Sequence, residues 1–213
     1  MTLLETTYQS TYGDKIKPYI INNMIKHPQG SPVYYATLYY GKSFDGDTLY
    51  VGEFRDRWNI TKVRGTHSFI SKLIRKSFGD IPLWYFIERH DDYEDAEGNT
   101  KKGHFHTHML IGSIDDDVIE NPSPYLMPLF YKEDESGIPI NMRATGIEQM
   151  KVLLLNACIR QAKWVGRHPA SLKLDLIEES EISQTISYNL KQIILPDDFN
   201  KVIDWDNSSF YKP

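Results

Sequence analysis

The pattern of hydrophobic and polar positions predicts a chain that mixes strands and helices. Stretches rich in aromatic, β-branched or alternating apolar residues predict strands at 34–40, 83–88, 104–111 and 171–177. An acidic loop at 91–103 joins the second stretch to the third, which predicts an antiparallel hairpin with a long connection. We therefore expect an α+β fold with a central antiparallel sheet of about five strands flanked by helices.

Helix signals lie between and after these strands. Helices are expected at about 66–78, 145–164 and 181–195. Thr66 is the expected N-cap of the first helix and Gly79 its end. The second helix is expected to start at the capping box formed by Thr145 and Glu148.

The domain organisation follows from length and from one irregular stretch. The segment 112–144 is rich in Asp, Pro and Gly and is long for a connection, so it is expected to be an irregular insertion. The 213 residues, 40% of them hydrophobic, suffice for one domain spanning 1–213. They leave no room for an additional helicase domain.

The composition of the chain bears on its cellular compartment and on the kinds of partner it binds. A single cysteine, Cys158, excludes a disulfide framework and is typical of a reducing compartment, so a cytoplasmic location is expected. No apolar run approaches the roughly 18 residues that a bilayer span requires, so no membrane partner is expected. The net charge of −5 argues weakly against nucleic acid, but residues 51–90 carry eight Lys or Arg against four Asp or Glu.

Three alternating histidines carry the strongest chemical signal. Alternate side chains of a strand share one face, so His104, His106 and His108 are expected to project together. Imidazole is both a common metal ligand and a possible nucleophile. The run by itself therefore leaves both chemistries open.

The last predicted helix has two polar-headed residues away from its apolar stripe. The expected buried stripe consists of Ile182, Ile186, Leu190 and Ile193. Tyr188 and Lys191 share a face that points away from this stripe. A tyrosine usually occupies a half-buried core position with its hydroxyl at the surface, and Tyr188 does not fit that pattern.

Three sequence motifs, taken in their order along the chain, resemble those of the HUH endonucleases. The resemblance is to the single-tyrosine initiators of rolling-circle replication in plasmids and viruses. The motifs are a strand with threonine among hydrophobic residues at 35–39, a histidine pair followed by hydrophobic residues at 106–111, and a tyrosine with a lysine three positions later at 188–191. The resemblance spans about residues 34–193 and implies that family's RRM-like sheet.

The resemblance also implies a metal site. The family's acidic ligand ends the strand before the histidines, where this chain has Glu88, and its histidine pair corresponds to His106 and His108. His104 is a possible alternative ligand, since Phe105 fits the hydrophobic position between paired histidines better than Thr107 does. The cofactor implied is a divalent ion, Mn²⁺ or Mg²⁺.

The activity implied is nicking and joining of single-stranded DNA. Tyr188 would attack the scissile phosphate and form a 5′-phosphotyrosine, with Lys191 supplying a nearby positive charge. A hairpin origin would be the substrate, and unwinding would depend on a host or separate helicase. Replication and transposition both remain open as the process served.

Basic residues along the first predicted helix are candidates for phosphate contacts. The expected DNA-binding residues are Lys62, Arg64, Lys72, Arg75 and Lys76. Ordinary solvated surface charge explains each of them equally well.

Two other functional interpretations stay open. The histidine run also resembles that of the histidine-triad nucleotide hydrolases and transferases, in which a histidine is the nucleophile and no metal is required. A non-catalytic nucleic-acid-binding module on a related sheet is the second alternative. Neither gives a reason for Tyr188 and Lys191 to lie off the helix's apolar stripe.

Overall fold

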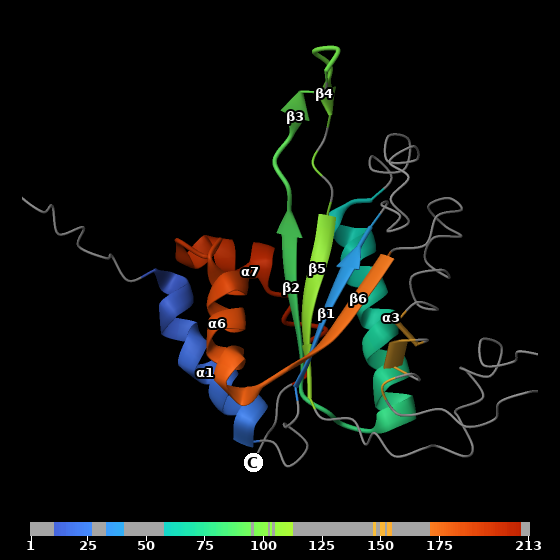
Figure 1. The fold of residues 1–213 in the computed structure, drawn as a ribbon, viewed down its shortest axis with the longest axis vertical. Helices are drawn as coiled ribbons and strands as arrows, with labels where there is room; N and C mark the ends of the chain where they lie inside the picture. Colours follow the sequence, from blue (N-terminus) through green and yellow to red (C-terminus); the bar gives the residue numbers. More distant parts are fainter. Residues whose placement is uncertain are drawn as a thin grey trace, which may run out of the picture.

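A computed structural model gives the architecture of the 213-residue chain. It describes residues 11–26, 33–40, 58–94, 96–101, 103, 105–112, 147, 150, 151, 153, 154 and 171–209. In this part of the chain the fold is α+β, with helices on both faces of an antiparallel sheet (Figure 1). The predicted fold class is confirmed at this level.

The main sheet contains four strands in the order β2-β5-β1-β6, and neighbouring strands are all antiparallel. The strands are β1 (Val33–Tyr39), β2 (Leu83–Arg89), β5 (Phe105–Ile111) and β6 (Ser171–Ile177). All four predicted strands are thus confirmed, and so is the antiparallel pairing of β2 with β5. The strands β5 and β1 occupy the centre of the sheet, and most of their residues are buried.

The main sheet has no fifth strand among the described residues, although about five strands were expected. The C-terminal segment instead contacts the outer edge of β2 through two isolated bridges, Leu83 with Ser209 and Phe86 with Ile203. A turn at 205–207 separates these bridges, so the segment cannot pair continuously. It still covers part of an edge that would otherwise expose unpaired backbone groups.

A two-stranded extension continues the β2–β5 hairpin beyond the main sheet (Figure 1). It consists of β3 (Tyr93–Glu94) and β4 (Thr100–Lys101), within the stretch predicted to be a plain loop. Gly98, in the turn between them, has a φ of 81°, a conformation that glycine adopts without strain. The acidic tip therefore projects away from the sheet.

Helix α3 (Ile60–Phe78) covers one face of the sheet. It begins six residues earlier than predicted, because Asn59 is its N-cap and accepts a hydrogen bond from the Lys62 N–H at 3.0 Å. Thr66 lies inside the helix and donates to the Lys62 carbonyl. The predicted end at Gly79 is confirmed, with a φ of 78°.

A large apolar core lies between α3 and the sheet. Its members include Val63, Ile70 and Ile74 of α3, with Ala36, Leu38, Tyr85, Ile87, Met109 and Ile111 of the strands. Three described residues of the predicted helix 145–164, Met150, Leu153 and Leu154, are fully buried in the same core. They are in helical conformation, as predicted.

Helices α1 (Tyr12–Lys26) and α6 (Glu179–Leu190) cover the other face (Figure 1). Ile182, Ile186, Leu190 and Ile193 are all buried as predicted, but α6 ends at Leu190, before the predicted end at 195, and Ile193 follows the helix. Helix α1 was not predicted, because Pro18 interrupts its pattern. Thr11 and Asp14 cap its first turn reciprocally, at 2.8 and 3.3 Å.

The chain ends with short elements beside β2, η2 (Pro196–Asp198) and α7 (Phe199–Val202). None of the helices within the described ranges is both long and apolar enough to cross a bilayer. The predicted insertion at 112–144 lies outside the described residues except for Gly112.

Candidate metal centre

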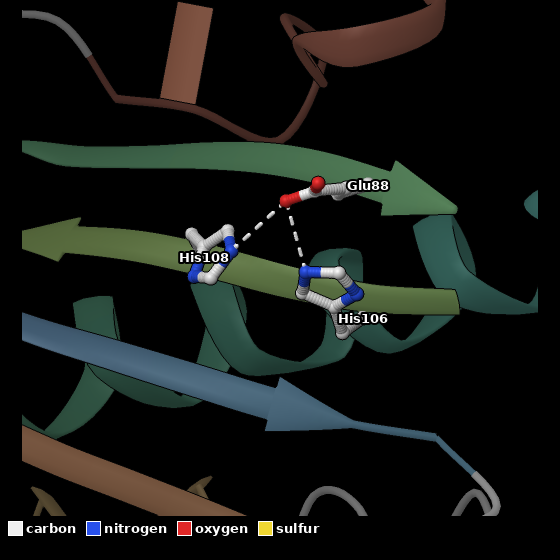
Figure 2. A group of neighbouring side chains, drawn as sticks. All are labelled: Glu88, His106 and His108. Atoms are coloured by element: carbon white, nitrogen blue, oxygen red, sulfur yellow. Dashed lines mark hydrogen bonds and ion pairs between the residues drawn. The ribbon is translucent and has the colours of Figure 1, made fainter. Parts of the chain in front are cut away.

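A carboxylate and two imidazoles meet on the α6-facing side of the sheet. Glu88 comes from the end of β2, and His106 and His108 come from β5 (Figure 2). Glu88 is paired with His106 in the strand register, and alternation brings His108 to the same face two residues further on. The sheet register therefore assembles the group that the sequence motifs singled out.

The spacing of these three side chains suits a bound metal ion. Glu88 Oε2 lies 3.0 Å from His106 Nε2 and 3.3 Å from His108 Nε2 (Figure 2). With metal–ligand bonds of about 2.1 Å, neighbouring ligand atoms around one ion are about 3.0 to 3.4 Å apart. All three ligand atoms lie within 4.8 Å of one another, so one ion fits the group.

Neighbouring polar groups hold these side chains in place. His108 Nδ1 lies 3.1 Å from Thr37 Oγ1, an outer contact that leaves Nε2 directed at the cluster. Glu88 Oε1 accepts from Lys191 Nζ at 3.0 Å and from Gln192 Nε2 at 3.1 Å. One carboxylate oxygen is therefore occupied by donors from the end of α6, and the other faces the imidazoles.

The protonation states favour cation binding. Burial, followed by the neighbouring His106, lowers the pKa of His108 to about 4. Burial also lowers the pKa of His106. Burial alone would raise the pKa of Glu88, but the Lys191 hydrogen bond and the imidazoles outweigh it and lower that pKa. At neutral pH the group thus offers two neutral imidazoles and a carboxylate, the forms that bind metal.

Two tyrosines of β1 stack on the histidines. The Tyr35 ring lies parallel to that of His108 with centroids 5.4 Å apart, and Tyr39 stacks on His106 at 5.7 Å. Burial raises the pKa of both phenols. Tyr35 also donates to Asn189 of α6 at 3.3 Å. The two tyrosines therefore line one side of the centre, and Tyr35 connects it to that helix.

Tyr188 stands next to the centre, as the sequence motifs led us to expect. Its ring centroid lies 5.7 Å from that of His108, and its side chain is 50% exposed. Lys191 Nζ lies 3.7 Å from the Tyr188 ring centroid. Although burial opposes it, hydrogen bonding to Glu88 and Tyr188 raises the pKa of Lys191, which stays charged. An exposed phenol, a cation and a metal-binding group therefore adjoin one another.

The predicted DNA-binding residues lie elsewhere. Lys62, Arg64, Lys72, Arg75 and Lys76 all belong to α3, which packs on the opposite face of the sheet from Glu88 and the histidines. Arg64 donates to the main-chain oxygen of Asn200, and Arg75 pairs with Asp80 at 3.1 Å. Their role in DNA binding stays a prediction, and it would have to involve DNA on the face of the sheet opposite Glu88 and the histidines.

Other outcomes concern residues that the motifs did or did not select. His104, the possible alternative ligand, lies outside the described residues. Gln192 and Thr37 were not predicted, although both hold metal-centre side chains. Thr37 belongs to the first motif, but only the strand register of the structure shows that it lies opposite His108.

Comparison of the chain with family models, curated proteins and solved structures finds no match. The proposed function therefore rests on the geometry of the site.

Proposed function

We propose that this chain is a metal-dependent endonuclease and strand transferase that nicks and rejoins single-stranded DNA through Tyr188. The observation that carries the proposal is the meeting of Tyr188 and Lys191 with Glu88, His106 and His108, across more than seventy residues of sequence. A structural metal site would not need an exposed phenol and a cation beside it. Initiation of rolling-circle replication is the process that the resemblance to HUH endonucleases favours.

Glu88, His106 and His108 would hold a divalent ion, Mn²⁺ or Mg²⁺. Such an ion, when bound, polarises the scissile phosphate and offsets the negative charge that builds up during attack. Two imidazoles and one carboxylate leave coordination positions free for phosphate oxygens. The stacked Tyr35 and Tyr39 rings restrict rotation of the two imidazoles.

Tyr188 is the proposed nucleophile. Its phenolic oxygen bonds to phosphorus, the bond from phosphorus to the 3′ oxygen breaks, the phenol loses its proton and the 3′ oxygen gains one. The 5′-phosphotyrosine keeps the energy of the broken phosphodiester, so a 3′-hydroxyl can attack it and rejoin the strand. Lys191, whose Nζ lies 3.7 Å from the Tyr188 ring centroid, favours the anionic oxygen during both steps.

The decisive experiment looks for the covalent intermediate. The protein is incubated with labelled single-stranded oligonucleotides, including hairpins, and Mn²⁺, and is then digested for mass spectrometry. We expect a nucleotide adduct on Tyr188, which EDTA and Tyr188→Phe both abolish. Tyr19→Phe is a matched control, because Tyr19 is 52% exposed and lies on α1.

Two further assays separate the alternative functions. Hydrolysis of a nucleoside phosphoramidate without metal, unaffected by Tyr188→Phe, would support a histidine-triad enzyme. Binding of single-stranded DNA with neither cleavage nor adduct in any divalent ion would support a non-catalytic module. Either result would overturn the nuclease proposal.

A further inference from the structure

A second polar cluster lies directly behind the metal centre, on the α3 side of the sheet. Thr107, between the two metal-centre histidines, points to this side and is fully buried. Its Oγ1 lies 2.9 Å from His67 Nε2 and 3.1 Å from the Tyr40 hydroxyl. His67 Nδ1 in turn lies 2.6 Å from Asp204 Oδ2.

The protonation states of this cluster fix the role of the His67 ring. Burial lowers the pKa of His67 and would raise that of Asp204, but the His67 hydrogen bond keeps the Asp204 pKa low. An ionised Asp204 accepts the Nδ1 proton, so Nε2 of a neutral His67 is an acceptor. It can accept from Thr107 or from the Tyr40 hydroxyl, which lies 3.2 Å away, and these two hydroxyls hydrogen-bond each other.

The cluster joins four separate parts of the chain. Tyr40 follows β1, His67 belongs to α3, Thr107 to β5 and Asp204 to the C-terminal segment. Asn207 also donates to Asp204 at 2.8 Å, and Tyr85 of β2 stacks on the His67 ring at 4.3 Å. Tyr40 and His67 therefore contact the one side chain between the metal-centre histidines directly, and Asp204 is linked to it through His67.

Stability alone gives little reason for this arrangement. A buried carboxylate is costly, and Asp204 Oδ1 has no hydrogen-bond partner within the described ranges. Leu38 and Ile87, which flank Thr107 in the strand register, both belong to the apolar core on this side of the sheet. The order of groups resembles that of a hydrolase triad, but the buried Thr107 cannot reach a substrate.

We propose that Asp204, His67 and Thr107 form a positioning chain for the metal centre, holding β5 from behind so that His106 and His108 keep their spacing. The inference rests on the metal centre of the proposed function but not on DNA cleavage. Outer contacts of this kind control metal affinity by fixing the ligands. Here the contact acts through the strand backbone, and Thr107 touches no ligand side chain.

The test measures Mn²⁺ affinity by titration calorimetry. Thr107→Val keeps the side-chain shape but removes the hydroxyl, and we expect binding to weaken about 10- to 100-fold. Thr107→Ser, which restores the hydroxyl, should stay within about three-fold of wild type. Ile74→Ala is the control for general destabilisation, since Ile74 is buried in the same core outside the cluster, and it should leave the affinity unchanged.

Each outcome decides the inference. Equal affinity of wild type and Thr107→Val, or equal losses in Thr107→Val and Ile74→Ala, would overturn it, while an adduct on Tyr188 would still support the nuclease. Strong Mn²⁺ binding that depends on Thr107 would support it even if no adduct formed. Absence of Mn²⁺ binding by the wild type would overturn both proposals. If Thr107→Val does not fold, Tyr40→Phe replaces it, with an expected loss of about 3- to 10-fold.

Discussion

The buried imidazole of His108 makes a quantitative prediction about acid stability without metal. Its pKa in the folded protein is about 4, against 6.5 for an ordinary histidine, because burial and His106 disfavour the charged form. As the pH falls below 6.5, the unfolded chain takes up this proton first, so unfolding becomes easier. The contribution is absent at high pH, grows between the two pKa values and is complete below about pH 4.

The difference of about 2.5 pKa units corresponds to about 3.4 kcal/mol at its limit, since one unit is worth about 1.4 kcal/mol. Between pH 7 and pH 5, His108 alone should lower the free energy of unfolding by about 2 kcal/mol. The assay is urea unfolding in EDTA, followed by the fluorescence of the tryptophans, which include the buried Trp84.

His108→Gln isolates this effect, because it removes one titrating group and keeps the others, including His67. Its free energy of unfolding should fall about 2 kcal/mol less than that of the wild type between pH 7 and pH 5. Equal losses in the two proteins would refute the reasoning. That result would mean that His108 is charged as readily in the folded protein as in the unfolded chain, and so is not held as a neutral ligand.

The remaining predictions concern the surroundings of the centre. Glu88→Gln removes the carboxylate between the two imidazoles and should weaken Mn²⁺ binding more than about 100-fold by calorimetry; near-normal affinity would exclude Glu88 as a ligand. Lys191→Met should slow oligonucleotide cleavage on the order of 100-fold while Mn²⁺ still binds, and unchanged single-turnover rates would exclude its role. Gly13→Ala should cost about 1 to 3 kcal/mol in urea unfolding, because the added Cβ would lie 2.8 Å from the Leu190 carbonyl where α1 meets α6; a neutral effect would contradict this close packing.

The sequence was sufficient for the parts of the fold that have strong periodicity. The strands at 33–39, 83–89 and 171–177 lie within one residue of their predicted bounds, because alternating or aromatic runs have few competing interpretations. Helix α1 was not predicted, because Pro18 lies inside it and proline is unfavourable within a helix. The start of α3 was misplaced because Thr66 and Asn59 are both acceptable caps, and only packing of Val63 on the sheet extends the helix to Asn59.

The same limits apply to the candidate site. Glu88, His106, His108, Tyr188 and Lys191 could be selected from motif order, and the structure brings all five together. Side chains that act across strands or from the far face could not be selected. The partnership of His67 with Asp204 spans 137 residues, and no local pattern encodes it.

The basic residues of α3 show why a charge count cannot replace packing. A helix buries one face against its sheet, and which face of the sheet it covers depends on chain connections that periodicity does not report. Here α3 takes the face opposite the metal centre, and α6 takes the near face.

The strand β5 has buried polar side chains on both faces at one point of the sheet. His106 and His108 face α6, while Thr107 faces α3, and all three are buried. A one-residue slip of β5 would exchange these faces, placing the histidines in the α3 core and Thr107 opposite Glu88. The buried hydrogen bonds of Thr107 oppose such a slip, because His67 and Tyr40 would each lose one hydrogen-bond partner. The polar groups behind the sheet therefore specify the register on which the metal centre in front depends.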